Sequence, residues 1–184
     1  VRTLNANATP TNPACFQTLT GSIAIAAVGG QQPYTYSLNG LSGPFLPALT
    51  GLGAGSYNIL VSDADGCQVP ISNAVQLIDP PLLTVSAVVT QDANCSANQG
   101  NLQATANGGT PNYSFVWDGN AALNAAVYNN ALPGLHTVVV TDAQGCTATA
   151  SATISNIPPI SLNLQGVTPE FCNRADGTAT VQVT

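Results

Sequence analysis

The stretch that decides the fold is YNILVSDADGC, residues 57–67, where apolar and polar side chains alternate up to an Asp-Gly turn and a cysteine. Alternation with period two indicates a β-strand with one buried face, and Asp-Gly is favoured in turns because it tolerates positive φ. The stretch returns as HTVVVTDAQGC at residues 136–146. A strand, a turn and a cysteine therefore form the core of a repeated unit.

The repeat extends well beyond this motif. Residues 21–67 align with residues 100–146 without a gap, Pro80-Pro81 recurs as Pro158-Pro159, and Cys15 recurs as Cys95 and Cys172. We therefore divide the chain into repeat 1 (residues 1–79), repeat 2 (80–157) and the opening of a truncated repeat 3 (158–184). Because the chain starts at Val1 rather than methionine, we expect it to be a segment of a longer protein.

Other parts of each repeat alternate in the same way and are separated by glycine-rich turns. The aromatic strands are Tyr34 and Tyr36 in repeat 1, and Tyr113, Phe115 and Trp117 in repeat 2. Several short strands with no helical period predict an all-β protein made of tandem immunoglobulin-like β-sandwich repeats of about 80 residues. Period-two spacing places these aromatic side chains in the core rather than on a carbohydrate-binding platform, which is the alternative for Trp117 and its neighbours.

The composition excludes several classes of partner. Charged residues make up 5% of the chain, against about 25% in ordinary globular proteins. Arg2 and Arg174 are the only basic residues and the net charge is −6, so no basic surface for nucleic acid exists. No apolar run is long enough to span a membrane, so direct membrane insertion is not expected. Since strand edges here lack the charges that usually protect them, we expect self-association with sister repeats or chains.

The cysteines predict disulfides and an oxidising compartment. Four cysteines allow three connectivities, and pairing within each repeat, Cys15 with Cys67 and Cys95 with Cys146, treats both repeats alike. Cys172 has no partner in this sequence under that scheme. Closing a loop of about 50 residues would stabilise each sandwich by about 4 kcal/mol in the chain-entropy description.

The motif order resembles the SprB repeats of surface and gliding proteins from Bacteroidetes-type bacteria. In repeat 1 the resemblance rests on Cys15, Gly21-Ser22-Ile23, Gly29-Gly30, Pro33-Tyr34-Thr35-Tyr36, Leu52 to Tyr57, and Val61 to Cys67. Repeat 2 departs from it with Asn112 after Pro111 and with His136 in place of the tyrosine. The resemblance implies long arrays in large exported proteins, an extracellular or cell-surface location, and a role in adhesion or gliding motility.

Candidate sites for catalysis are few, and we predict that the chain is not an enzyme. The one histidine, His136, occupies the place of Tyr57 and is interpreted as an aromatic substitute in the fold. Asp63 and Asp65 are candidates for weak calcium binding, because two carboxylates beside a glycine turn resemble the start of a calcium loop. The alternative is a hairpin turn in which Asp63 and Asp142 cap backbone amides. No other cofactor or metal is expected, and Asn7, Asn94 and Asn112 are candidate glycosylation sites.

Three hypotheses for function follow. The first is a stalk or filament segment of a secreted cell-surface protein, joined by short proline linkers that restrict bending. The second is a glycan- or surface-binding module acting through the divergent loops Leu41 to Gly55 and Asn120 to Gly134. The third is a spacer in a secreted multidomain enzyme.

Overall fold

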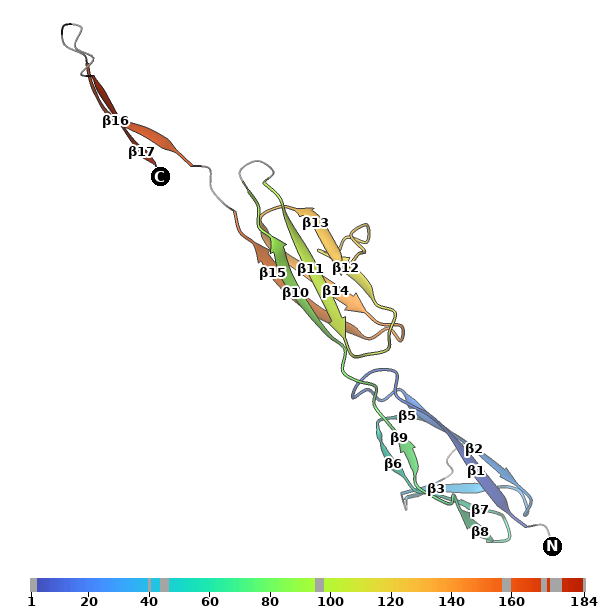
Figure 1. Cartoon of the computed structure of the whole chain (residues 1–184). Helices are drawn as coiled ribbons and strands as arrows, with labels where there is room; N and C mark the ends of the chain where they lie inside the picture. The colour runs from blue at the N-terminus through green and yellow to red at the C-terminus, as the bar shows by residue number, and fades with distance from the viewer. Residues whose placement is uncertain are drawn as a thin grey trace.

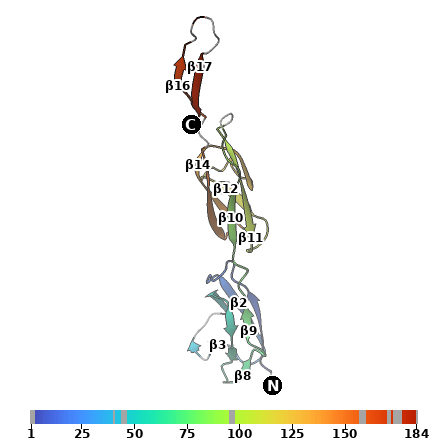
Figure 2. The same ribbon diagram turned by 60° about the vertical axis from the view of Figure 1, so that its left-hand side comes forward.

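The computed structural model describes residues 3–39, 41–43, 47–94, 98–156, 160–169, 172 and 177–183. Every regular element in these ranges is a β-strand. Repeat 1, repeat 2 and the repeat 3 hairpin follow one another along a rod, with the N-terminus at one end and the hairpin at the other (Figure 1). The arrangement stays end to end when the molecule is turned (Figure 2).

Repeat 1 is a β-sandwich with an irregular flank. One sheet has the order β1-β2-β5, the second has the order β4-β3-β7-β8, and β6 pairs with β9. The bounds are β1 (Asn5–Thr11), β2 (Gly21–Val28), β3 (Thr35–Leu38), β4 (Leu41–Gly43), β5 (Ala48–Leu52), β6 (Gly55–Tyr57), β7 (Ile59–Ser62), β8 (Gln68–Pro70) and β9 (Val75–Leu77).

Repeat 2 is the more regular sandwich. Its sheets have the orders β10-β11-β13 and β12-β14-β15, and all pairs are antiparallel. The bounds are β10 (Thr84–Gln91), β11 (Gly100–Asn107), β12 (Ser114–Trp117), β13 (Val127–Ala131), β14 (Gly134–Thr141) and β15 (Thr147–Ile154).

Each sandwich has its own core, which the alternating residues fill. In repeat 1 the buried cluster includes Ile23, Ile25, Leu49, Ile59, Val61 and Leu77. In repeat 2 it includes Leu102, Ala104, Trp117, Ala131, Val138 and Ile154. The predicted fold class, tandem immunoglobulin-like β-sandwiches, is confirmed.

The flank of repeat 1 is broken because its chain is longer there. Cys67 and Leu77 occupy the places of Cys146 and Ile154, so two more residues lie between them than in repeat 2. Pro70 has no N–H to continue the ladder, and Ile71 N–H donates to Ile59 O before the chain bends at residues 72–73. One continuous strand in repeat 2, β15, is therefore split into β8 and β9 in repeat 1.

Repeat 3 is represented by an antiparallel hairpin of β16 (Leu162–Thr168) and β17 (Thr178–Val183). The pair Leu162–Val183 repeats the pair Val85–Ala106 of repeat 2. No strand pairing crosses residues 79–80 or 157–158 in the described part of the chain. The second double proline, Pro158-Pro159, lies outside the described residues. None of the described segments forms a helix that could span a membrane.

Candidate functional site

The cysteine-bearing turn of repeat 1 is organised by one buried carboxylate. Asp63 is 7% exposed, and its Oδ1 accepts N–H groups from Asp65 at 3.1 Å and Cys67 at 2.8 Å. Its Oδ2 accepts the N–H of Gln31 at 3.1 Å, from the loop after β2. The carboxylate thus ties the loop after β2 to the turn after β7 and fixes the backbone that carries Cys67.

Repeat 2 contains the same arrangement. Asp142 accepts the N–H groups of Gln144 and Cys146 at Oδ1, both at 2.9 Å, and that of Thr110 at Oδ2, at 2.8 Å. Burial raises the pKa of Asp142, but these N–H donors outweigh burial, so the pKa lies below its ordinary value of 3.8. The prediction that Asp63 and Asp142 cap backbone amides is confirmed. We name this unit the aspartate turn, residues 63–67 and 142–146.

Glycine is required beneath each aspartate turn. Gly30 and Gly109 have φ of +55° and +60°, and a Cβ there would lie 2.5 and 2.6 Å from the Oδ2 atoms of Asp63 and Asp142. A side chain would therefore displace the carboxylate as well as strain the backbone. This explains why the Gly-Gly pair and the aspartate recur together in both repeats.

A second cysteine lies at the other end of repeat 1. Cys15 is in the loop between β1 and β2, where its N–H donates to Thr18 Oγ1 at 3.3 Å and the Thr18 hydroxyl donates to Cys15 O at 2.8 Å. Ala14 N–H donates to Thr20 Oγ1 at 2.8 Å. These bonds hold Cys15 on the end of repeat 1 that faces repeat 2.

The structure joins Cys15 to Cys146, with their Cα atoms 5.7 Å apart. The disulfide therefore links repeat 1 to repeat 2, and the predicted pairings Cys15–Cys67 and Cys95–Cys146 are wrong. Cys67 and Cys172 are exposed free cysteines, and Cys95 lies outside the described residues.

The geometry of the sandwich explains the correction. Cys15 precedes Gly21 at the start of β2, whereas the Asp63 carboxylate ties Cys67 to the loop after Val28 at the end of β2. Eight strand residues span about 26 Å, while a disulfide needs Cα atoms roughly 4.4–6.8 Å apart. The two cysteines of one repeat thus lie at opposite ends of it and cannot bond to each other.

The joint has a second attachment, the peptide linker at Pro80-Pro81. Asn12 Oδ1 accepts the N–H of Ile78 at 2.9 Å just before this linker, and Asp92 Oδ1 accepts the N–H of Ser155 at 2.8 Å at the same place in repeat 2. The disulfide lies in a groove lined by Phe16 from repeat 1 and by Leu82, Leu83, Gly145 and Thr147. Repeats 1 and 2 are therefore held at two points.

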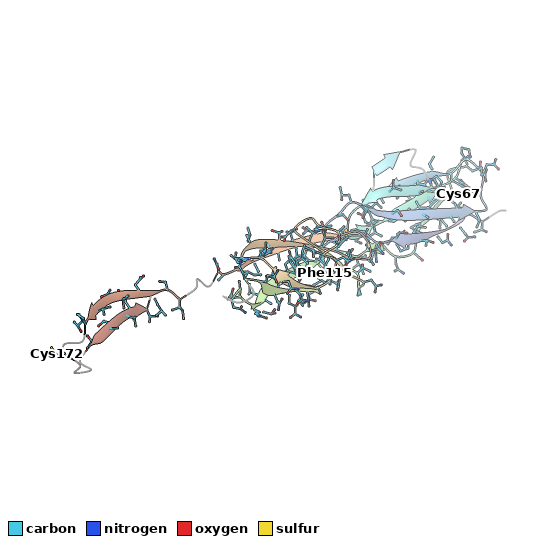
Figure 3. All side chains as sticks on the ribbon, turned by 90° about the horizontal axis from the view of Figure 1, so that it is seen from above. Cys67, Phe115 and Cys172 are labelled. Carbon is cyan, nitrogen blue, oxygen red and sulfur yellow. A yellow bond between two sulfur atoms is a disulfide. The ribbon has the colours of Figure 1, made fainter. Side chains whose placement is uncertain are left out.

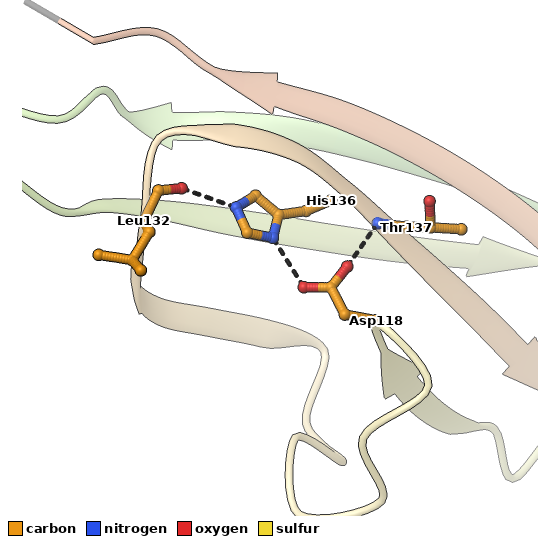
Figure 4. A network of polar contacts seen from close by, with 4 residues as sticks. All are labelled: Asp118, Leu132, His136 and Thr137. Atoms are coloured by element: carbon orange, nitrogen blue, oxygen red, sulfur yellow. Dashed lines mark hydrogen bonds and ion pairs between the residues drawn. The ribbon is translucent and has the colours of Figure 1, made fainter.

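His136 takes the place of Tyr57, bonds the same aligned backbone carbonyl, and adds a charge pair. Tyr57 OH donates to Gly53 O at 2.8 Å, and His136 Nε2 lies 2.7 Å from Leu132 O, the aligned carbonyl (Figure 4). His136 Nδ1 lies 2.7 Å from Asp118 Oδ2. Both partners are acceptors, so a proton on each ring nitrogen satisfies both.

The environment favours this protonated form of the ring. Burial lowers the pKa of His136, but the hydrogen bonds to Asp118 and Leu132 O and the charge of Asp118 outweigh burial and raise the pKa above 6.5. Asp118 Oδ1 also accepts the N–H of Thr137 at 2.9 Å, as Asn39 Oδ1 accepts that of Asn58 at 2.8 Å in repeat 1. The group is a structural network at the surface of the sandwich, with His136 buried and Asp118 exposed.

The aromatic strands face the cores, as predicted. Trp117 is 0% exposed, and its Nε1–H donates to Ala125 O at 3.0 Å. Phe115, labelled in Figure 3, packs against the same core. Tyr34 and Tyr113 donate their hydroxyls to Gly29 O and Gly108 O. The Trp117 ring is therefore not available to stack on a sugar, and glycan binding elsewhere on the repeats stays a hypothesis.

The remaining candidate residues lie at the surface or in the aspartate turn. Asp65 is exposed beside Asp63, and calcium binding by this pair stays a prediction. Within the described ranges, no group of three His, Cys, Asp or Glu side chains is placed to hold a metal ion. Asn7 and Asn112 are exposed and Asn94 is half-buried, and glycosylation of all three stays a prediction.

Two segments of the chain match the model of a known repeat family. Residues 7–43 and 87–122 match the family model of the SprB repeat. No curated protein matches the chain significantly.

Solved structures that resemble the chain contain tandem immunoglobulin domains. An eight-domain fragment of Down Syndrome Cell Adhesion Molecule is 14% identical with a TM-score of 0.38, covering 89% of this chain and 25% of that one. A structure on Dscam isoform specificity is 15% identical with a TM-score of 0.35, covering 82% of this chain and 46% of that one.

A C-terminal fragment of intimin in complex with the intimin-binding domain of its translocated receptor is 14% identical with a TM-score of 0.32, covering 90% of this chain and 55% of that one. The chain thus spans about half or less of the length of these structures. The resemblance to SprB is confirmed over two segments, because residues 7–43 in repeat 1 and 87–122 in repeat 2 are similar to the SprB repeat model.

Proposed function

We propose that the chain is a stalk segment of a secreted cell-surface protein, and that its joints are built to resist bending and extension. The observation that carries the proposal is the Cys15–Cys146 disulfide, which connects neighbouring repeats instead of bracing either one. A single peptide linker lets two domains swing, whereas two separated attachments oppose both swinging and twisting. A rod that spans distance or transmits force needs such joints.

The path that force takes through the chain supports the same role. When the ends are pulled apart, tension reaches Cys15, crosses the disulfide, and continues from Cys146, which lies 131 residues further along the sequence. The segment between the two cysteines contains β2 to β14, including most of both cores. Tension therefore bypasses most of both sandwiches while the disulfide is intact.

Single-molecule pulling between the two ends tests this function. In the oxidised protein, residues between Cys15 and Cys146 should add no length at any force that leaves the disulfide intact. After reduction, unfolding should release roughly 450 Å more, since the bypassed segment covers 131 residues at about 3.3–3.6 Å each. Equal extension before and after reduction would remove the force-bearing role.

Surface recognition is the second candidate, and exposed apolar side chains in the divergent loop region of repeat 2 favour it. Val127, Leu132 and Leu135 are 44%, 59% and 67% exposed on or beside residues 120–134. Such side chains favour contact with an apolar or solid surface. Adsorption measured on a quartz microbalance should fall several-fold in the Leu132→Ser, Leu135→Ser double variant. Val28→Ser, at a 63% exposed position in repeat 1, is the control and should leave adsorption unchanged.

A further inference from the structure

Cys67 occupies the same place in repeat 1 that the bonded Cys146 occupies in repeat 2. The two aspartate turns hold their cysteines with matching bonds, Cys67 N–H to Asp63 at 2.8 Å and Cys146 N–H to Asp142 at 2.9 Å. The glycines before them have φ of +81° and +84°. One of these equivalent thiols is in a disulfide between repeats, and the other is exposed and free.

The residues that surround Cys146 in its disulfide, which we call its seat, have counterparts around Cys67. In repeat 2 the disulfide lies beside Leu83, which is 7% exposed, and next to Gly145. In repeat 1 the aligned residues are Leu4, which is 9% exposed, and Gly66. The alignment holds at the backbone too, because Gly29 abuts Thr3 O as Gly108 abuts Leu82 O. Repeat 1 thus presents an unfilled copy of this seat on the end away from repeat 2, in which Thr3 and Gln68 stand at the places of Leu82 and Thr147.

The partner that fits the seat is a cysteine in the place of Cys15. Cys172 is such a residue, since it lies in the loop between β16 and β17 as Cys15 lies between β1 and β2. It is exposed and free, and it lies toward the opposite end of the molecule from Cys67 (Figure 3). Among the described residues, one unfilled half of the joint therefore lies toward each end of the chain, and Cys95, which also stands in the place of Cys15, lies outside them.

We propose that Cys67 forms a disulfide with a cysteine in the place of Cys15 on another copy of this repeat, so that every joint of an array is bonded like Cys15–Cys146. The partner of Cys67 is thus a second SprB-type repeat, joined head to tail. The inference deepens the proposed stalk and rests on it for the order of repeats along a rod.

The chemistry balances with a disulfide oxidant such as oxidised glutathione. The Cys67 thiolate attacks the oxidant, forms a mixed disulfide and releases one glutathione thiolate. The thiolate of the partner cysteine then attacks the Cys67 sulfur and releases the second. Two thiols and one glutathione disulfide become one protein disulfide and two molecules of glutathione.

The test uses the whole chain in a Cys95→Ser background, which leaves Cys172 as the one free cysteine in the place of Cys15. The protein is incubated in a glutathione redox buffer, alkylated, and digested with pepsin, because two arginines and no lysine make trypsin unsuitable. We expect covalent multimers of the 18.5 kDa chain and a peptide pair joining Cys67 of one copy to Cys172 of another.

Two single variants provide matched controls. Cys67→Ser and Cys172→Ser should each reduce multimers at least tenfold while the Cys15–Cys146 peptide pair remains. Mixing the two variants should restore dimers and nothing longer, since each supplies one half of the joint. Alkylated Cys67 in a monomer, a Cys67–Cys67 bond, or a Cys67–Cys15 bond would overturn the inference. The readout is the bonding partner of Cys67, so it can fail while the pulling experiment still supports a stalk.

Discussion

At the scale of single residues, the two repeats use different side chains at two aligned positions to bond the same backbone groups. Asn39 and Tyr57 in repeat 1 become Asp118 and His136 in repeat 2. Both pairs cap the same aligned backbone N–H and bond the same aligned carbonyl, but the second pair carries opposite charges. A tyrosine has one O–H, which the aligned carbonyl accepts, whereas the doubly protonated ring of His136 donates to that carbonyl and to Asp118 as well.

The charge pair makes the stability of repeat 2 depend on pH near neutrality. The pKa of His136 is raised above 6.5 in the folded state, so folding favours the protonated ring. The stabilisation is complete below the ordinary pKa and is lost as pH rises through the raised value. We expect the melting temperature of repeat 2 to fall over that range. The double variant Asp118→Asn, His136→Tyr copies repeat 1 and should remove this pH dependence, measured by Trp117 fluorescence during thermal unfolding. An unchanged pH dependence in the double variant would contradict this assignment.

Asp142 should control stability in acid. Its folded pKa is lowered, so its contribution is present above the ordinary value of 3.8 and is lost as pH falls through the lowered value. Asp142→Asn keeps the shape but loses charge-assisted acceptors, and should destabilise repeat 2 by about 1–3 kcal/mol at neutral pH. Denaturant unfolding followed through Trp117 measures this. Gln144→Asn, on an exposed side chain of the same turn, is the control and should change stability little. Equal effects of the two variants would show that the Asp142 carboxylate does not organise its turn.

At the scale of the elements, the glycine within the aspartate turn and the glycine that packs beneath it are not equivalent. A Cβ on Gly109 would meet Asp142 Oδ2 at 2.6 Å, whereas a Cβ on Gly145 would have no atom within 4 Å. Both glycines have positive φ, so Gly145→Ala tests backbone strain alone. It should lower the free energy of unfolding by about 1–2 kcal/mol. Gly109→Ala adds displacement of the carboxylate and should cost roughly 3 kcal/mol or more. Denaturant unfolding of the two variants compares them, and similar losses would show that the carboxylate moves aside freely.

The strands could largely be predicted from the sequence, because period two is imposed by burial of one sheet face. Val138, Val140 and Trp117 are all 0% exposed, as the alternation predicts. The break between β8 and β9 could not be predicted. The two extra residues leave no periodic pattern in the sequence, and Pro70 alone does not determine where the next strand begins. The Asp118–His136 pair has a signal in the sequence, the joint change from Asn39 and Tyr57 in repeat 1.

The disulfide was mispredicted for a reason of symmetry. Pairing within repeats treats two isolated repeats alike, but pairing each repeat with the next also treats every repeat alike in a longer array. Strand length distinguishes the two schemes, because β2, with eight residues, separates the positions of Cys15 and Cys67 by about 26 Å. The alternation that predicts the strand therefore already excludes the bond within one repeat.

At the scale of the whole molecule, each sandwich is stabilised by its own core and the disulfide acts between them. Repeat 3 illustrates what a partial repeat lacks. Its hairpin leaves Leu162, Leu164, Val181 and Val183 between 57% and 67% exposed, while the aligned face in repeat 2 is covered by β12, β14 and β15. A whole repeat is therefore the unit that folds, whereas the stiffness of the rod depends on the joint between two repeats.

The position of the bond predicts a change of shape that a staple inside one sandwich would not produce. Small-angle X-ray scattering of Cys15→Ser should show a shorter and broader distribution of maximum dimensions, because the linker at Pro80-Pro81 then acts alone. Cys67→Ser is the matched control and should leave the scattering of the monomer unchanged. In the chain-entropy description the bond also restricts the unfolded chain between Cys15 and Cys146, so its loss should lower the melting temperature of repeat 1 as well. A large drop in melting temperature with unchanged scattering would show that the disulfide stabilises the repeats without stiffening their joint.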